Sequence, residues 1–328
     1  MNELATIERI EEIKPHPNSD KLDLARVLNY WCIVPKDTYV AGSTVAYIRP
    51  DSMLPADREW ATSFLRYTNR GRCRAVRLRG EWSEGIILHL DKVLPEIGNP
   101  FFNFNYGTEV GNFLGITKFE PPVPNTAGAK RYLPLNIPRT DEERWQNLRN
   151  LEQLIGQDVV VTLKIDGQSF TAYSTPEEQG ICSRSLELKM GEGFDSNWHA
   201  VERKYDILNG LRKLYPMGRL AVRGEVYGPT IQALEHNPHC RKPLNLAVYS
   251  VWDIENEEYV NWSEVSSLAE SLGIPTVPVL ERAVLTRELI EKYDSGLETI
   301  DGMPFEGVVV KGDGWSFKII NKHYDSRK

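Results

Sequence analysis

The chain has 328 residues, of which 39 are basic and 46 acidic, giving a net charge of −7. This length predicts one to three domains, most simply two, and the acidic balance argues against a protein that binds nucleic acid over its whole surface. There is no apolar run of about 18 residues and no secretion signal, so we expect no membrane span and a cytoplasmic location, or a nuclear one in a eukaryote. Four widely spaced cysteines without a CxxC pair argue against a zinc knuckle or a disulfide framework.

The first part of the chain is predicted to be a small β-barrel. Short apolar and β-branched segments between residues 4 and 110 alternate with turn residues, which is typical of closely spaced strands. The strand-like segments are 5–7, 24–34, 43–48 and 72–78, with a turn at 16–20. We assign residues 1–115 to a closed or partly open barrel of this kind.

A basic cluster lies within the predicted barrel. Six arginines fall within fourteen residues, beside Tyr67 and Trp82. Arginine next to an aromatic ring suits the binding of a nucleic-acid strand, and the spacing predicts extended structure with basic side chains grouped on a face. The alternative is a solvated strand face without a ligand. The cluster begins at Arg66, and its candidate nucleic-acid contacts are Arg70, Arg72, Arg74, Arg77 and Arg79.

A proline-rich segment, residues 116–139, is predicted to link two domains. Prolines 121, 122 and 124 predict a stiff, extended connection. The second domain is therefore assigned to residues 140–328. Thr140 and Glu143 fit a capping box, which predicts that a helix begins there.

The second domain is predicted to have an α+β fold with antiparallel hairpins. β-branched runs predict strands, and apolar residues at helical spacing predict helices. The strands are 159–163, 169–173, 307–310 and 315–320, and the helices are 198–215 and 264–272. Neither a Walker motif nor GxGxxG is present to bind the phosphates of a nucleotide.

The sequence Lys164-Ile165-Asp166-Gly167 follows a run of valines. A lysine amine can attack a phosphorus atom only as the neutral base, so its pKa of about 10.4 must be lowered by burial, a metal ion or a nearby cation. A buried strand that ends in Lys164 supplies the burial, and Asp166 can help to hold a metal ion. The tetrapeptide alone is weak evidence, and the alternative is a surface lysine.

Further polar motifs follow Lys164 in order. They are Ser183-Arg184-Ser185, Glu225 in Arg-Gly-Glu-Val-Tyr-Gly, Trp252-Asp253, Glu306 to Lys311, and Phe317-Lys318. This series resembles the collinear motifs of the covalent nucleotidyltransferases, which include DNA ligases, RNA ligases and mRNA-capping guanylyltransferases. Six matches in the right order make the resemblance specific.

The resemblance implies how a nucleotide would be bound. Lys164 would attack ATP and become lysyl-AMP. Arg184 and Glu225 would contact the ribose hydroxyls, and Trp252 would stack on the adenine. Thr162 and Leu163, just before the lysine, lie where contacts to the nucleotide are usual. Arg144 would reach the triphosphate. Simpler alternatives are an edge-strand charge for Glu225 and a core aromatic for Trp252.

The resemblance also implies metal and phosphate binding. Asp166, Glu225 and Glu306 would hold Mg²⁺ or Mn²⁺ directly or through water, and Lys311 and Lys318 would stabilise charge on the α-phosphate. Strand alternation places residues 306 and 311 on opposite faces, so the lysine is expected to turn back at the strand end. Many ligases have two lysines in the last motif, whereas this chain has a serine at position 316.

The order of the domains indicates which of these enzymes the chain resembles most. DNA ligases and capping enzymes have an OB domain after the catalytic domain, whereas almost nothing follows Lys318 here and the predicted barrel comes first. Residues 15–22 are similar to OB modules of the tRNA-binding type, and residues 113–122 and 140–144 resemble RNA ligases. Nearly the whole chain therefore resembles the Deinococcus/Naegleria type of ATP-dependent RNA ligase.

Such an enzyme joins a 5′-phosphate to a 3′-hydroxyl through lysyl-AMP and an adenylylated polynucleotide. The resemblance implies a nicked RNA or RNA/DNA duplex as substrate, with RNA on the 3′-hydroxyl side, and a monomeric enzyme. The alternatives are a DNA ligase, a capping guanylyltransferase, and a nonenzymatic RNA-binding protein with a degenerate ligase domain.

Overall fold

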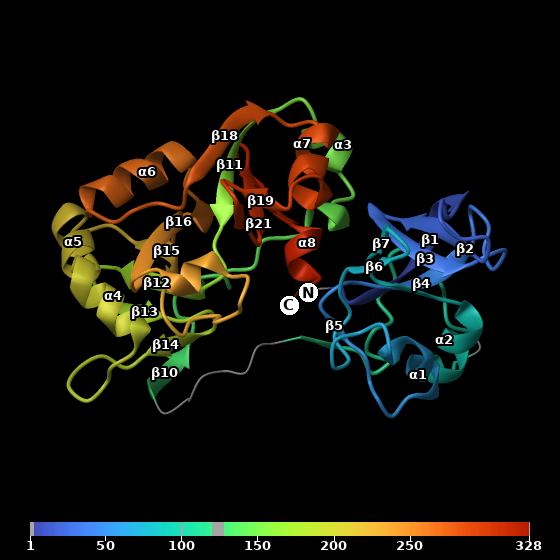
Figure 1. Cartoon of the computed structure of the whole chain (residues 1–328). Helices are drawn as coiled ribbons and strands as arrows, with labels where there is room; N and C mark the ends of the chain where they lie inside the picture. Colours follow the sequence, from blue (N-terminus) through green and yellow to red (C-terminus); the bar gives the residue numbers. More distant parts are fainter. Residues whose placement is uncertain (1–2, 100, 120–127, 328) are drawn as a thin grey trace. The chain divides into compact units, whose positions relative to one another are not determined.

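The computed structural model describes residues 3–99, 101–119 and 128–327. The chain divides into two compact units, residues 1–123 with 146–149 and residues 124–145 with 150–328. Both units combine β-sheets with short helices (Figure 1), so the predicted α+β fold class is confirmed. Prolines 121, 122 and 124 of the predicted connection lie outside the described residues. In the described part of the chain, no helix is long and apolar enough to cross a membrane.

The first unit is built on a five-stranded antiparallel sheet in the order β3-β2-β1-β4-β8. A register shift between Ile10 and Glu12 divides the long β1, which pairs with β4 before the shift and with β2 mainly after it. β3 also lies against β7 and β8, so the sheet curls towards a barrel. The elements are β1 (Ala5–Pro15), β2 (Leu22–Val27), β3 (Tyr30–Pro35), β4 (Thr44–Ile48), β5 (Ser52–Met53), α1 (Glu59–Leu65), β6 (Val76–Leu78), β7 (Glu81–Ser83), β8 (Ile86–Leu88), α2 (Leu90–Ile97) and β9 (Thr117–Lys118).

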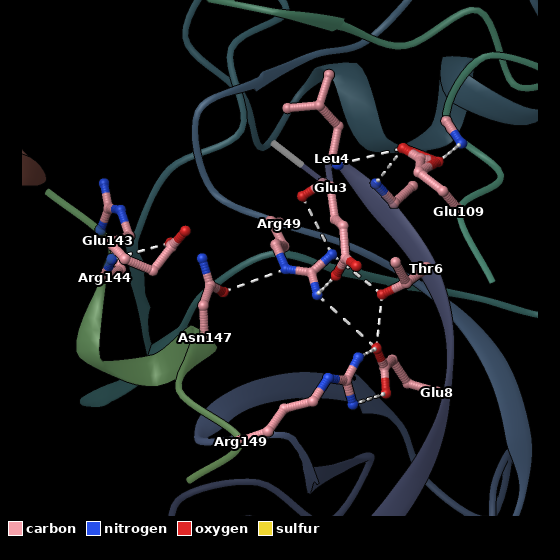
Figure 2. A network of polar contacts seen from close by, with 12 residues as sticks. Glu3, Leu4, Thr6, Glu8, Arg49, Glu109, Glu143, Arg144, Asn147 and Arg149 are labelled. Atoms are coloured by element: carbon pink, nitrogen blue, oxygen red, sulfur yellow. Dashed lines mark hydrogen bonds and ion pairs between the residues drawn. The ribbon is translucent and has the colours of Figure 1, made fainter. Parts of the chain in front are cut away.

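A network of charged groups holds the returning segment Gln146–Arg149 on this unit (Figure 2). Arg149 donates from Nη2 to Oε1 of the fully buried Glu8 at 2.8 Å. Arg49, which is 5% exposed, donates to Asn147 Oδ1 at 3.1 Å and to Thr6 Oγ1 at 3.0 Å. A buried charge is costly unless it is paired and hydrogen-bonded, so loss of a partner of Glu8 or Arg49 destabilises this unit.

We expect Arg49→Ala to lower the free energy of unfolding of this unit by about 3 kcal/mol, because it removes one partner from a buried ionic network. Chemical unfolding measures the loss, and hydrogen exchange of the β1 and β4 amides locates it. The matched control is Arg26→Ala, whose ion pairs with Glu11 and Glu12 are partly exposed. The control should cost less than about 1 kcal/mol, and equal losses in the two variants would contradict the role of the network.

The described residues of the second unit form two large antiparallel sheets and a two-stranded sheet of β19 and β20. A seven-stranded sheet has the order β10-β14-β13-β12-β15-β16-β17, and a four-stranded sheet has the order β18-β11-β21-β22. One face of the larger sheet packs against α4, α5 and α6 through residues such as Phe170, Val222 and Leu268 (Figure 1). Since side chains alternate along β15, Arg223 and Glu225 lie on its other face.

The elements of the second unit are β10 (Ala129–Tyr132), α3 (Leu151–Leu154), β11 (Asp158–Lys164), β12 (Gln168–Ser174), β13 (Gln179–Cys182), β14 (Leu186–Leu188), α4 (Asn197–Tyr205), α5 (Ile207–Leu214), β15 (Leu220–Tyr227), β16 (Asn245–Asp253), β17 (Glu258–Tyr259), α6 (Trp262–Ser271), β18 (Val279–Val284), α7 (Arg287–Glu291), β19 (Thr299–Ile300), β20 (Met303–Pro304), β21 (Gly307–Lys311), β22 (Ser316–Ile320) and α8 (Lys322–Asp325).

Four predicted elements differ from the structure. The strand-like segment 24–34 is two strands, β2 and β3, which pair with each other. No helix begins at Thr140, whose hydroxyl instead donates to Ser169 Oγ at 2.8 Å; only a 3₁₀ turn, Trp145–Asn147, follows. The helix predicted over 198–215 is two helices, because Asp206 adopts a left-handed φ of 50° that ends α4. The strand predicted over 72–78 is present only as the short β6.

Candidate functional site

Lys164 is the last residue of β11, and the register of the four-stranded sheet shows which side chains share its face. Thr162 pairs with Val309, and Val309 pairs with Lys318. Lys311 lies two residues beyond Val309 on β21. Because paired residues and alternate residues of a strand share a face, Lys164, Lys311 and Lys318 lie on the same face of the sheet.

This register bears on the expectation that Glu306 and Lys311 lie on opposite faces of one strand. β21 begins at Gly307, so Glu306 precedes the strand and does not follow its alternation. Its Oε2 lies 2.5 Å from Nζ of Lys164. Lys311 therefore shares the face of Lys164 without the expected turn back at the strand end.

The charge state of Lys164 differs from the sequence-based expectation. Burial lowers the pKa of Lys164, as predicted, but the negative charges of Glu306 and Glu225 and the hydrogen bond that Lys164 donates to Glu306 outweigh it, so the pKa is raised above its ordinary value. The amine is thus held as a cation in the free protein. Burial, a metal ion or a nearby cation was named from the sequence as a way to lower this pKa, and the carboxylates that raise it were not counted.

Glu225 and Asp166 complete an acidic group around the amine. Burial raises the pKa of Glu225 to about 8; Lys164 opposes this rise, and the like charges of Glu306 and Asp166 add to it. Gly167 allows the turn to approach β15, since a Cβ at this position would lie 2.4 Å from the carbonyl oxygen of Val226. The Asp-Gly turn therefore brings Asp166 towards Glu225.

Lys311 has a different environment from Lys164. Its Nζ donates to the backbone oxygen of Tyr249 at 2.9 Å and lies 5.5 Å from the centre of the Trp262 ring. Burial lowers the pKa of Lys311, and Glu142 opposes that shift. In the free protein Lys311 therefore loses its proton more readily than Lys164.

The segment before Trp145 lies along β22 and contacts several predicted site residues. Asp141 bridges two of them, with Oδ2 3.0 Å from Arg184 Nη2 and Oδ1 3.3 Å from Lys318 Nζ. The backbone N–H of Lys318 donates to the carbonyl of Glu143 at 2.8 Å, and Arg144 forms a parallel bridge with Lys318. The structure thus brings Arg144, Arg184 and Lys318 together through a segment that sequence analysis predicted to be helical.

The same segment also contacts Ser316, which stands where many ligases have a lysine in the last motif. Ser316 lies on β22 and donates from Oγ to Glu142 Oε2 at 2.6 Å. A lysine at position 316 would add a second cation beside Lys318. Here the serine instead holds the acidic segment against the strand.

Comparison with known proteins identifies the family. A family model described as RNA ligase matches residues 157–320, half of the chain, and includes Lys164, the acidic group and both phosphate-binding candidates. The chain belongs to the RNA ligase family. A model of an OB-fold domain matches residues 4–90, which confirms the predicted N-terminal OB-like barrel. No match was found among curated proteins.

Solved structures of an RNA ligase from Naegleria gruberi are similar to this ligase over its full length. A lysine-to-alanine variant with ATP and Mn has a TM-score of 0.85 and 29% identity, with 99% of each chain covered. The same enzyme with pyrophosphate has a TM-score of 0.86 and 29% identity, covering 99% of this chain and 98% of that one. The predicted resemblance to the Naegleria type of RNA ligase is therefore confirmed.

Two aromatic residues of β16, Trp252 and Tyr249, are candidates for contact with the adenine, and stacking by Trp252 stays a prediction. Trp252 is 9% exposed, packs with Tyr173, and makes an edge contact with Tyr259 at 4.8 Å between ring centres. Tyr249, three residues earlier, is near Glu225, and burial raises its pKa. Tyr249 is a further candidate for the site, which the sequence analysis did not name.

Two further candidates lie immediately before Lys164. The hydroxyl of Thr162 donates to the backbone oxygen of Val309 at 3.1 Å, and Thr162 is almost fully buried. Leu163 is partly buried against the core of the second unit. In this structure Thr162 therefore stabilises the pairing of β11 with β21, and its contact with a nucleotide stays a prediction.

The arginine cluster of the first unit is not one extended segment with its basic side chains grouped on a face, as was predicted. Arg74 is buried, and Arg72 pairs with Asp51 and lies 4.0 Å from the centre of the Phe119 ring. Arg77 lies over Trp82, outside any long strand. The most exposed members are Arg66, Arg70, Arg77 and Arg79. Binding of RNA by these side chains stays a prediction.

Proposed function

We propose that this RNA ligase uses ATP and forms a covalent lysyl-AMP on Lys164. Nζ attacks the α-phosphorus, a phosphorus–nitrogen bond forms, the bond to pyrophosphate breaks, and the amine loses its proton. The observation that supports this most directly is the placement of one lysine at a strand end, 2.5 Å from Glu306 and within an acidic group that contains Asp166 and Glu225. The Naegleria gruberi structures with ATP, AMP and pyrophosphate support the same chemistry.

The next two steps join the ends. AMP passes from Lys164 to a 5′-phosphate, and a 3′-hydroxyl then attacks the activated phosphate and releases AMP. Lys318 and Lys311 would stabilise the charge that builds on the α-phosphate, which is the role that phosphoryl transfer most requires. Arg184 would contact the ribose, Arg144 the triphosphate, and Trp252 or Tyr249 the adenine.

The carboxylates are suited to a divalent cation. Mg²⁺ and Mn²⁺ prefer oxygen ligands, and three carboxyl groups interact with Lys164. Among the residues that the structure describes, no three acidic, histidine or cysteine side chains are close enough to hold an ion together, so Asp166, Glu225 and Glu306 would bind it partly through water. When bound, it would neutralise the carboxylates that keep Lys164 protonated and would lower the pKa of that amine.

The substrate we propose is a nick in a duplex with RNA on the 3′-hydroxyl side, held partly by the first unit. Labelled ATP and GTP separate the candidate enzymes: labelling by GTP alone would indicate a capping enzyme. Nicked duplexes with RNA or DNA on each side then define the strand preference. Sealing of DNA ends alone would indicate a DNA ligase, and absence of any labelled protein would indicate a nonenzymatic RNA-binding protein.

We expect Asp141→Asn to lower the KM for ATP by about two- to fivefold, because it removes a charge that competes with the nucleotide for Lys318 and Arg184 while keeping a hydrogen-bond acceptor. Initial rates of pyrophosphate release at varied ATP measure this. Asp313→Asn is the control, since this exposed aspartate lies in the loop before β22, the strand that carries Lys318. An equal change of KM in both variants would show that the net charge of the protein, and not the contacts of Asp141, determines the KM for ATP.

A further inference from the structure

The short helix α8 contacts two of the acidic residues around Lys164. The backbone N–H of Asn321, at the N-cap of α8, donates to the carbonyl of Glu306 at 2.9 Å. The hydroxyl of Tyr324 donates to Oδ2 of Asp166, also at 2.9 Å. One helix therefore connects two loops that are far apart in the sequence and that carry the candidate metal-binding carboxylates.

The position of α8 is fixed by its own contacts. Lys322 Nζ lies 2.6 Å from Asp294 Oδ2, and both side chains are at most 10% exposed. Asn321 is fully buried; its Oδ1 accepts from His323 N, and its Nδ2 donates to the backbone oxygen of Leu297. A helix anchored in this way can hold a side chain in one place more accurately than a free loop can.

Tyr324 and Asp166 form a buried pair. Tyr324 is 2% exposed and Asp166 is 7% exposed. The ring of His236 contacts the Tyr324 ring at 4.4 Å between centres, and Asn237 Nδ2 donates to the backbone oxygen of Asp166 at 3.0 Å. Asp166 is thus held at its backbone by one loop and at its carboxylate by α8.

We propose that Tyr324 is a positioning residue that orients the Asp166 carboxylate for a divalent cation. This inference rests on the proposed function of Asp166. The phenol O–H occupies Oδ2 and limits rotation of the carboxylate, as hydrogen-bond donors behind metal ligands generally do. Loss of such a donor commonly weakens metal binding by about tenfold or more.

The test compares Tyr324→Phe with Tyr293→Phe. Each change removes one hydroxyl from a buried tyrosine of the same unit; the Tyr293 hydroxyl donates to Glu281, outside the acidic group. Binding of Mn²⁺ to the nucleotide-free protein is measured from the paramagnetic resonance signal of free Mn²⁺. The rate of lysyl-AMP formation is then measured against Mg²⁺ concentration at saturating ATP, and thermal unfolding is recorded for each variant.

For Tyr324→Phe we expect about tenfold weaker Mn²⁺ binding and a similar rise in the Mg²⁺ concentration that gives half the maximal rate, with little change in that maximum. Tyr293→Phe should match the wild type. Unchanged Mn²⁺ binding in Tyr324→Phe overturns the inference, as does a lower thermal stability or maximal rate without a change in metal dependence, or an absence of Mn²⁺ binding by the wild type. If wild-type protein binds Mn²⁺ but forms no lysyl-AMP, the proposed function fails, and the binding comparison still decides the role of Tyr324.

Discussion

Lys164→Ala is expected to abolish labelling of the protein by ATP carrying radioactive α-phosphate, with a loss of at least about 10⁴-fold, because the change removes the attacking nitrogen. Sealing of an RNA end that has been adenylylated in advance should persist at a measurable rate, since that step needs no lysyl-AMP. The two assays together separate loss of the nucleophile from loss of the fold.

Lys213→Ala is the control for this experiment, because Lys213 is an exposed lysine of α5 in the same unit. It should label like the wild type. Continued formation of a covalent AMP adduct by Lys164→Ala would contradict the assignment of the nucleophile. Loss of that adduct in Lys311→Ala alone would transfer the assignment to Lys311, whose pKa burial lowers in the free protein.

Glu306→Gln is expected to reduce the maximal rate of lysyl-AMP formation by about a hundredfold or more, because it removes a charged group that contacts Lys164 and is proposed to bind the cation. The same substitution also makes the Lys164 amine easier to deprotonate. The negative charge of Glu306 raises the pKa of Lys164, so its removal lowers that pKa. The neutral amine then forms at lower pH, and the pH–rate profile should shift towards acid.

The pH profile distinguishes this account from simple structural damage. The rate is measured from about pH 6 to 9 at saturating ATP and Mg²⁺ for the wild type, Glu306→Gln and Glu298→Gln. Glu298 is an exposed carboxylate of the same unit and should leave both the rate and the profile unchanged. A slow Glu306→Gln enzyme whose profile coincides with that of the wild type would show that Glu306 does not control the proton on Lys164.

The strands that carry Lys164 and the last motif could be predicted because their signals are local. A run of valines ends in Lys164, and the glycines at 312 and 314 mark a tight hairpin between β21 and β22. Antiparallel pairing then places Lys311 and Lys318 on the face of Lys164. Glu225 was identified as a candidate from the order of the motifs, because local periodicity does not single it out.

The features that were missed depend on contacts between distant segments. Thr140 and Glu143 have the spacing of a helix cap, but the hydroxyl of Thr140 bonds to Ser169 and the segment lies along β22 instead. Tyr249 is the extra residue of β16 at the register shift between Arg223 and Gly224 of β15. The face on which an extra residue of this kind lies does not follow from strand alternation alone. The raised pKa of Lys164 likewise reflects carboxylates from other strands and loops.

The central claim is tested most directly by locating AMP on the protein. Wild-type protein is incubated with ATP and Mg²⁺, digested, and sequenced by tandem mass spectrometry under conditions that preserve a phosphoramidate bond. We predict one AMP per chain, on the peptide that contains Lys164 and on that side chain. An intact protein that gains no AMP, or that carries it on Lys311 or another residue, would contradict the account.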